Sequence, residues 1–308
     1  MGRTRRGNPV HGWVVVDKPE NATSVDVVAA VRRGCDAAKA GHSGTLDPLA
    51  TGVLPIALGE ATKTVPYLMD GAKSYRFTVR WGEQRDTDDA EGRTIAVSDV
   101  RPDAEAIRAV LPRFTGEIDQ TPPTFSAIKV EGRRAYDLAR ADVAVDLATR
   151  RVEIKAVELA ACPDDDHAEF LVVCGKGAYM RALARDLAAA LGTCGYVVAL
   201  RRTAVGSFSE ADAIPLDKVK TLGHSDELLQ HVLPVEAALA DIPALDFTPA
   251  EAIRLKHGQS VPVLPVARRT SEKLVLKDRM IFAMADGKPV ALARVQGGEI
   301  RPIRVLNL

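Results

Sequence analysis

The chain of 308 residues has few of the features that mark secreted, metal-binding or membrane proteins. Its 4 cysteines lie far apart and form no Cys-x-x-Cys pair, which argues against a disulfide framework and a zinc site. No apolar run approaches the roughly 18 residues of a membrane span. The basic N-terminus lacks the apolar segment of a signal peptide. We therefore expect a cytoplasmic protein that binds neither a membrane nor a structural metal.

Aromatic residues are scarce at 5%, and the formal net charge is zero. Since apolar residues make up 46% of the chain, Ala, Val and Leu must fill the core. Zero net charge argues against nucleic-acid binding through overall charge, but charges of one sign do cluster locally. A basic group comprises Lys129, Arg133, Arg134, Arg140, Arg150 and Arg151, and an acidic group comprises Asp86, Asp88, Asp89 and Glu91. Solvated faces explain most such clusters, and a basic side that faces RNA is the alternative.

The length and patterning predict a mixed α+β main domain followed by a smaller one. Residues 73–81 alternate between apolar and polar, which is typical of a half-buried antiparallel strand, and residues 82–92 look like the turn after it. Helices are expected at 24–33, 103–111 and 178–191. Composition changes near residue 240, where 241–244 is a plausible linker, and short apolar runs joined by Asp286-Gly287 predict a small β-rich domain.

Asp47 stands out because glycines and prolines surround it in the run Gly41-His42-Ser43-Gly44-Thr45-Leu46-Asp47-Pro48. Glycines allow tight turns, and Pro48 keeps Asp47 away from helical geometry. A carboxylate in such a loop has a defined direction. The alternative is a structural turn in which the Asp47 side chain caps its own backbone.

The stretch from Gly41 to Leu54 resembles a catalytic loop of the TruB-type tRNA pseudouridine synthases, G-H-x-G-T-L-D-P-x-A-x-G-V-L, at every fixed position. Further matches to this family are Asp17-Lys18-Pro19, Lys73-Ser74-Tyr75, Gln120-Thr121-Pro122-Pro123, Gly177-Ala178-Tyr179-Met180-Arg181 and Leu200-Arg201-Arg202-Thr203. The resemblance implies a largely antiparallel sheet with flanking helices in a catalytic domain over 1–240. It also implies an RNA-gripping insertion, the thumb, at 119–151, and a PUA-like RNA-binding domain over 245–308.

The same resemblance implies roles for single residues. Asp47 acts on the sugar, either as nucleophile at C1′ or as base at C2′, and Arg181 is its cationic partner. The catalytic set is Asp47, Tyr75, Tyr179 and Arg181, and the substrate-binding set is His42, Leu200, Lys18, Lys129, Arg133 and Arg134. The Tyr75 ring would stack on a flipped uracil with its hydroxyl near C5, Tyr179 would orient Asp47 or the base, and Leu200 would wall the pocket.

Simpler readings exist for several of these side chains. Arg181 would otherwise form a surface ion pair with Asp186 or another acid. Tyr75 and Tyr179 would be core tyrosines, and His42 would be a loop histidine that satisfies backbone groups.

Pseudouridine formation breaks the N1–C1′ bond of uridine and joins C5 to C1′, so the resemblance implies an isomerase without cofactor or metal. We expect a monomer that modifies position 55 in the T-arm of tRNA without a guide RNA. Three alternatives stay open: a non-catalytic RNA-binding protein, a guide-RNA-dependent relative, and a sugar hydrolase. The hydrolase would need a second acid, which the Asp47 loop does not offer.

Overall fold

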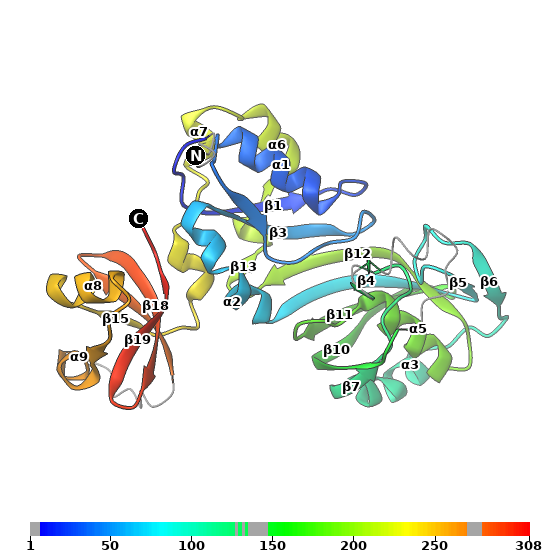
Figure 1. Ribbon diagram of the computed structural model, residues 1–308. Coiled ribbons are helices and arrows are strands. Elements are labelled where there is room, and N and C mark those ends of the chain that lie inside the picture. The colour runs from blue at the N-terminus through cyan, green and yellow to red at the C-terminus, as the bar shows by residue number, and fades with distance from the viewer. Residues whose placement is uncertain (1–6, 127–128, 131–132, 135–146, 270–278) are drawn as a thin grey trace.

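A ten-stranded mixed sheet forms the body of the protein, as a computed structural model shows over residues 7–126, 129–130, 133–134, 147–269 and 279–308 (Figure 1). Its strand order is β14 (Ile214–Pro215), β1 (Gly12–Lys18), β3 (Thr51–Leu58), β12 (Gly195–Val205), β4 (Lys73–Trp81), β11 (His167–Cys174), β10 (Arg150–Asp164) and β7 (Gly116–Gln120). Two short strands extend it: β2 (Ala40–His42) pairs with β3, and β13 (Phe208–Ser209) pairs with β12. The β1–β14 and β3–β12 pairs are parallel and the others antiparallel, which confirms the predicted fold class.

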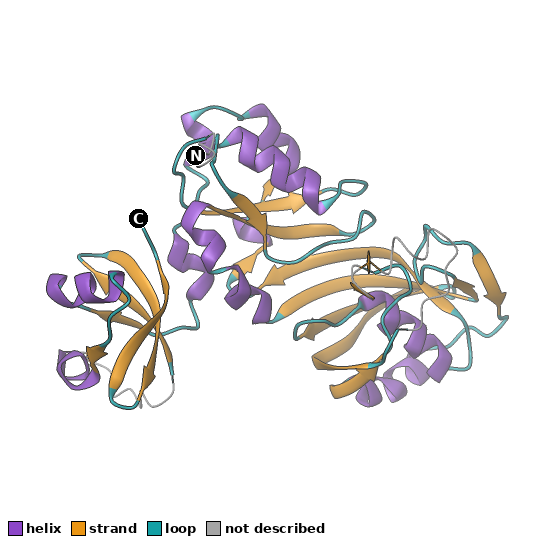
Figure 2. Ribbon diagram, in the orientation of Figure 1, coloured by secondary structure: helices purple, strands orange, loops and turns teal. Residues whose placement is uncertain are grey.

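Helix α1 (Ser24–Gly34) shows how local sequence sets the ends of elements. Thr23 and Asp26 form a capping box at the start of the helix. Arg32 and Arg33 lie in the last turn, where their positive charges interact favourably with the negative end of the helix dipole. The other helices of the main domain are α2 (Val65–Asp70), α3 (Ala104–Val110), α5 (Met180–Ala190), α6 (Leu216–Thr221) and α7 (Asp226–Leu229). Single 3₁₀ turns occur at Gly59–Lys63, Leu111–Phe114, Glu210–Asp212 and Val235–Leu239. Strands and helices are interspersed along this domain, and some strands follow one another directly, as β10 and β11 do (Figure 2).

The segment 82–92 is more than the turn that its sequence predicted. Strand β5 (Glu83–Arg85) pairs with β6 (Thr94–Val97) to form a separate two-stranded ribbon. The helix predicted from residue 178 begins at Met180, because Tyr179 is its extended N-cap residue. Long-range contacts shape the backbone in both segments: Asp88 and Asp89 contact arginines of α5, and Gln120 binds the backbone of Tyr179.

The thumb segment 119–151 begins and ends inside the main sheet. Its first residues belong to edge strand β7 and its last to β10, with Gln120 opposite Arg150. Between them, β8 (Lys129–Val130) and β9 (Arg133–Arg134) form a short antiparallel pair. The insertion therefore leaves from and returns to neighbouring strands at one edge of the sheet.

The C-terminal part is β-rich, as predicted. Its five-stranded sheet has the order β15 (Ala244–Asp246), β17 (Met280–Ala285), β18 (Lys288–Gln296), β19 (Glu299–Val305) and β16 (Val261–Pro262). Helices α8 (Pro249–Lys256) and α9 (Val263–Arg269) accompany it. The Asp286-Gly287 hairpin is confirmed, since both residues have the positive φ values, 50° and 71°, that such a tight turn requires.

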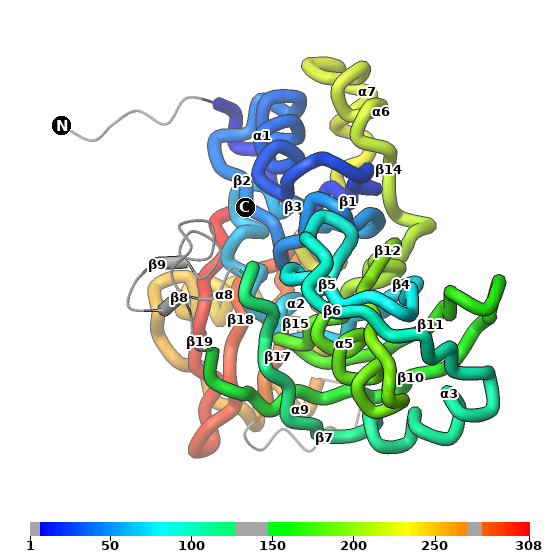
Figure 3. Tube along the Cα trace, turned by 90° about the vertical axis from the view of Figure 1, so that its right-hand side faces the viewer, coloured from blue at the N-terminus to red at the C-terminus, as the bar shows by residue number. Residues whose placement is uncertain are grey.

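Strand β1 is buried on both faces and contributes residues to two apolar clusters. Val14 and Val16 pack into the core of the main domain. Trp13 and Val15 lie in a second apolar cluster that includes Phe282 of the C-terminal sheet. Figure 3, turned by 90°, shows α1, α6 and α7 gathered above β1.

The predicted linker 241–244 is held by hydrogen bonds at both ends. The Ile242 N–H donates to the Leu239 carbonyl, and the Phe282 N–H donates to the Pro243 carbonyl, each at 2.8 Å. Along the described ranges, no helix has the length and apolar character needed to cross a membrane.

Candidate active site

The loop between β2 and β3 presents Asp47 on a backbone that is fixed on both sides. Before it, the buried Ser24 hydroxyl accepts from the Leu46 N–H (2.9 Å) and donates to the Leu46 carbonyl (3.0 Å). After it, the Pro48 carbonyl accepts from the Asn21 N–H (2.9 Å). The Asp47 carboxylate points to Arg181 rather than capping its own loop, and 37% of the side chain is exposed.

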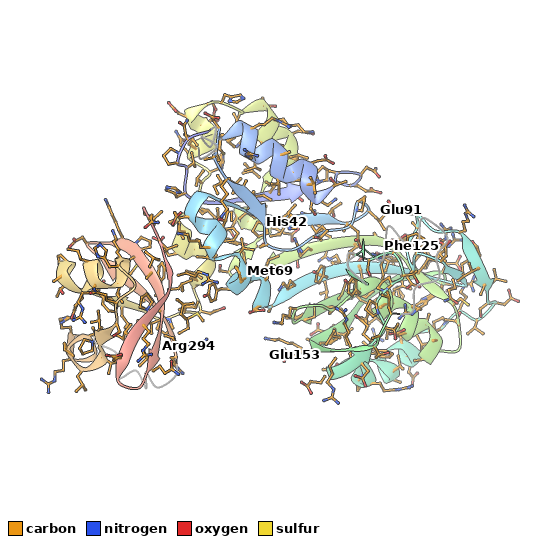
Figure 4. All side chains as sticks on the ribbon, viewed as in Figure 1. His42, Met69, Glu91, Phe125, Glu153 and Arg294 are labelled. Carbon is orange, nitrogen blue, oxygen red and sulfur yellow. The ribbon has the colours of Figure 1, made fainter. Side chains whose placement is uncertain are left out.

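Arg181 is buried and holds the carboxylate from the first turn of α5. Its Nη2 lies 2.8 Å from Asp47 Oδ2, and its Nη1 lies 3.4 Å from Asp89 Oδ2. Its other hydrogen bonds go to the carbonyls of Thr87 and Phe125, both at 2.9 Å (Phe125 is labelled in Figure 4). Such anchoring fixes the direction of the charge that faces Asp47. The simpler reading of a surface ion pair with Asp186 is wrong.

The acidic residues at 88–89 face arginines of α5 rather than solvent. Asp88 Oδ2 lies 2.8 Å from Arg185 Nη1, while the neighbouring Asp89 contacts Arg181. Both aspartates are buried, and burial raises the pKa of Asp88 to about 6 despite Arg185. Asp186, for its part, pairs with Arg185 at 3.0 Å. The idea of a solvated acidic turn is therefore wrong for these two positions.

A pocket of about 280 Å³ lies in front of the Asp47–Arg181 pair. It brings together the predicted residues Asp47, Tyr75, Tyr179, Arg181 and Leu200. Met69, at the end of α2, also lines it (labelled in Figure 4). Residues from five separate segments of the chain thus converge on one carboxylate.

Tyr75 and Tyr179 are both half-buried in this pocket. Burial raises the pKa of each hydroxyl, and for Tyr179 the negative charge of Asp47 adds to the effect. Both hydroxyls are therefore protonated at neutral pH. Because both tyrosines line the pocket, they are not simply core residues.

Gln120 positions Tyr179, a role that the sequence had not assigned. Its side-chain amide accepts from the Tyr179 N–H (2.8 Å) and donates to the Tyr179 carbonyl (3.1 Å). Gln120 is almost fully buried. It lies in a quoted family motif, but its long-range partner could not be read from that motif.

Lys18 lies beneath the Asp47 loop and does not line the pocket, which contradicts its prediction as a substrate-binding residue. Its ammonium is buried and donates to the carbonyls of Pro19 (3.0 Å), Ala22 (2.7 Å) and Pro48 (3.1 Å). Burial lowers its pKa to about 8, while the Asp47 charge works in the opposite direction. Lys18 therefore supports the loop from behind.

His42 also lies outside the pocket lining. Its Nδ1 accepts from the Gly44 N–H at 3.2 Å, as the simpler reading of a loop histidine had it. Burial lowers its pKa, and the positive charge of Arg202 adds to this effect. A direct contact between His42 and substrate stays a prediction.

For the thumb residues Lys129, Arg133 and Arg134, the structure describes the backbone pairing of β8 with β9. Their side chains lie outside what is described, so their proposed contacts with phosphates stay a prediction.

Two buried cations, Lys73 and Arg202, line the pocket and were missed as site residues. The Lys73 ammonium donates to the carbonyls of Met69 and Gly71 at the end of α2. Both residues fall within motif segments that sequence reasoning had quoted, so the signal was present. In the described part of the chain, no group of three or more His, Cys, Asp or Glu side chains could hold a metal.

Comparison with known proteins assigns the family. Residues 32–180 match the model of the TruB family pseudouridylate synthase N-terminal domain, and residues 181–240 match that of the tRNA pseudouridylate synthase B C-terminal domain. The chain is 59% identical to tRNA pseudouridine synthase B of Rhodospirillum rubrum and 52% identical to that of Caulobacter vibrioides. Both alignments cover 100% of each chain.

Solved structures support the fold. The chain resembles a crystal structure of the archaeal box H/ACA sRNP Nop10–Cbf5 complex with a TM-score of 0.72 at 24% identity, covering 99% of this chain and 92% of that one. A Cbf5–Nop10–Gar1 complex gives a TM-score of 0.73 at 24% identity, covering 99% of this chain and 91% of that one. At this level of identity, the likeness concerns the fold alone.

The family matches thus place the chain in the pseudouridine synthase class, whose members are nucleoside-isomerising enzymes. Within that class, the chain belongs to the TruB family of pseudouridylate synthases.

Proposed function

We propose that this protein converts uridine to pseudouridine at position 55 in the T-loop of tRNA, with Asp47 as the group that acts on the sugar. The observation that carries the proposal is the 2.8 Å ion pair between Asp47 and Arg181 at the pocket. The buried guanidinium holds this carboxylate in a fixed position at the wall of the pocket. Asp47 keeps enough exposure to meet a substrate.

The size of the pocket supports a flipped base as the group it takes. A volume of about 280 Å³ suits one nucleobase rather than a folded RNA segment. An enzyme that acts on a base held in a folded RNA must extrude it. The Tyr75 ring then stacks on the uracil, and Leu200 closes the opposite wall.

Asp47 breaks the N1–C1′ bond as nucleophile at C1′ or as base at C2′. The Tyr75 hydroxyl lies on the C5 side of the bound base and takes part in the transfer of the C5 proton. Because its pKa is raised, it begins the reaction as a neutral hydroxyl. Tyr179, held through its backbone by Gln120, orients Asp47.

The tRNA substrate is inferred from relatives that are named tRNA pseudouridine synthase B and that match over the whole chain. We assign phosphate binding to the thumb at 119–151 and RNA binding to the PUA-like domain at 245–308, with the catalytic domain at 1–240. Phosphate contacts supply affinity, and the folded shape of the T-arm supplies specificity.

The test is incubation of the purified protein, without any other RNA, with unmodified tRNA, followed by mapping of pseudouridine at each position. We expect modification at position 55 alone. Modification elsewhere would contradict the position. A requirement for an added RNA would favour the guide-dependent alternative, and binding without modification would favour the non-catalytic one.

A further inference from the structure

The pocket carries more positive charge than its carboxylate balances. Its charged lining residues are Asp47, Lys73, Lys176, Arg181 and Arg202. Arg181 pairs with Asp47, and Lys176 pairs with Asp70 outside the pocket at 2.7 Å. Across the described residues, neither Lys73 nor Arg202 forms an ion pair with a carboxylate.

Arg202 is the more unusual of these two cations because only 2% of it is exposed. Its Nε donates to the Val53 carbonyl at 2.8 Å, and its Nη2 donates to the Gly44 carbonyl at 3.3 Å. A guanidinium has five N–H donors, so these two bonds leave donors for a further partner. A buried cation without a counter-ion is costly to fold, so its position calls for an explanation.

The chemistry of the reaction explains why a cation is buried there, because the reaction moves a negative charge from Asp47 to the base. If Asp47 is the nucleophile, its oxygen bonds to C1′ and the electron pair of the N1–C1′ bond stays on the uracil. If Asp47 is the base, it takes the C2′ proton, a C1′–C2′ double bond forms, and the same pair stays on the uracil. In both routes Asp47 becomes neutral and the uracil becomes an anion.

We propose that Arg202 is a catalytic residue that donates hydrogen bonds to the detached uracil anion. Arg181 balances the charge while it resides on Asp47, and Arg202 balances it once it resides on the base. The charge returns to Asp47 when C5 bonds to C1′. The Asp47–C1′ bond breaks in the first route, and Asp47 gives its proton back to C2′ in the second, while the C5 proton leaves and N1 takes up a proton. A fixed guanidinium stabilises such a developing anion more strongly in a closed pocket than in water.

The site has the geometry that this role requires. Arg202 and Tyr75 line the same pocket, and the guanidinium lies close enough to the Tyr75 hydroxyl to oppose the rise in pKa that burial causes there. The bond to the Gly44 carbonyl also connects Arg202 to the Asp47 loop. A cation tied to that loop and facing the stacking tyrosine is well placed to meet the base.

The test uses a substrate that needs less stabilisation of its anion. One tRNA transcript contains uridine and a second contains 5-fluorouridine throughout, because fluorine withdraws electrons and lets the detached ring carry negative charge more easily. Joining of the sugar to the base carbon is followed under single-turnover conditions by liquid chromatography with tandem mass spectrometry of nuclease digests, because the two isomers have equal mass and differ in retention and fragmentation. We expect Arg202→Met to lower the rate about 10²–10³-fold on the uridine transcript. On the fluorinated transcript its loss should be at least about tenfold smaller.

Arg201→Met is the matched control. Arg201 precedes Arg202 on β12 but lies outside this pocket, where it pairs with Asp17 through two contacts of 3.0 Å. This variant should show the wild-type ratio between the two transcripts. An Arg202→Met protein that keeps the wild-type rate, or loses the same factor on both transcripts, would overturn the proposal.

If Arg202→Met fails to fold, Arg202→Lys answers the same question. Lysine keeps the positive charge but lacks the planar guanidinium, so we expect a smaller loss of rate, and this loss should again be smaller on the fluorinated transcript than on the uridine transcript. Equal losses of rate on both transcripts would reject the role.

The choice of transcript rests on the proposed tRNA function. Failure of that function would appear as inactivity of the wild-type protein on both transcripts, whereas the Arg202 role is judged from variant-to-wild-type ratios.

Discussion

Arg181 shows how one residue can serve folding and chemistry together. It contacts the partly exposed Asp47 on one side and the buried Asp89 on the other. The inner carboxylate and two backbone carbonyls hold the guanidinium in place, so its charge reaches Asp47 in a fixed direction. This arrangement holds the reacting carboxylate in place at the part-buried pocket.

Replacing Asp47 with Asn should therefore abolish turnover and leave tRNA binding within a few-fold of wild type. The change is nearly isosteric, but the amide is neither a nucleophile nor a base, and affinity comes from contacts with phosphates. Pseudouridine formation and filter binding measure the two effects separately. Asp217→Asn, at a fully solvated position, is the control and should keep both. A near-wild-type rate for Asp47→Asn would remove Asp47 from the mechanism.

Asp88 predicts a dependence of stability on pH. Burial raises its pKa from 3.8 to about 6. Between these values the folded protein holds a proton that the unfolded chain releases, so the contribution of Asp88 to stability falls as pH rises through this window. Asn cannot ionise. The free energy of unfolding of Asp88→Asn, relative to wild type, should therefore rise by up to about 3 kcal/mol between pH 4 and pH 7.

Urea unfolding at intervals of one pH unit measures this difference. Asp88→Ala serves as a second variant. Its free energy of unfolding relative to wild type should follow the same pH trend, shifted by a constant amount because the contact with Arg185 is lost. A difference that stays constant across the window would show that Asp88 ionises alike in the folded and unfolded chains.

Sequence reasoning found the residues that lie in a distinctive local pattern, such as Asp47 and Tyr75. It did not find the buried roles of Asp88 and Asp89, because a run of acids reads as a solvated turn until α5 is placed against it. Gln120 was missed for the same reason, since its partner Tyr179 is distant in sequence. Long-range hydrogen bonds leave no local signature.

At the scale of elements, short-range patterns gave accurate boundaries. The alternation over 73–81 corresponds to β4 (Lys73–Trp81), and the helix expected at 24–33 corresponds to α1 (Ser24–Gly34). The α5 boundary was two residues off because the Gln120 contact holds Tyr179 in an extended conformation. Local propensity thus fails where a tertiary contact decides the backbone.

The thumb carries a prediction about ionic strength. If Arg133 and Arg134 on β9 neutralise phosphates, replacing both with Ala should reduce the slope of log affinity against log salt by about one to two. The Michaelis constant should rise more than the maximal rate falls. Binding titrations at several salt concentrations measure the slope. The double variant Lys218→Ala with Lys220→Ala on α6 is the matched control and should leave the salt slope unchanged. An unchanged slope in the arginine variant would contradict the role of 119–151 in binding phosphates.

The whole molecule is joined across β1. Residues of its outer face share an apolar cluster with the C-terminal sheet, so the two domains are packed together rather than tethered. The sequence indicated a separate β-rich domain but not this contact, because a strand that is apolar on both faces does not say which element covers which face.

Phe282 tests this coupling. It belongs to β17, is 2% exposed, and lies in the shared cluster with Trp13. Phe282→Ala should lower the free energy of unfolding by about 3–5 kcal/mol, since it leaves a cavity between the domains. Thermal and urea unfolding of the full chain measure the loss.

Leu264→Ala, at a position 68% exposed on α9, is the control and should stay within about 0.5 kcal/mol of wild type. Coupled domains predict that the main domain, followed by the fluorescence of its two buried tryptophans, Trp13 and Trp81, loses stability together with the C-terminal sheet. A tryptophan unfolding transition that Phe282→Ala does not move would show that the two domains fold independently.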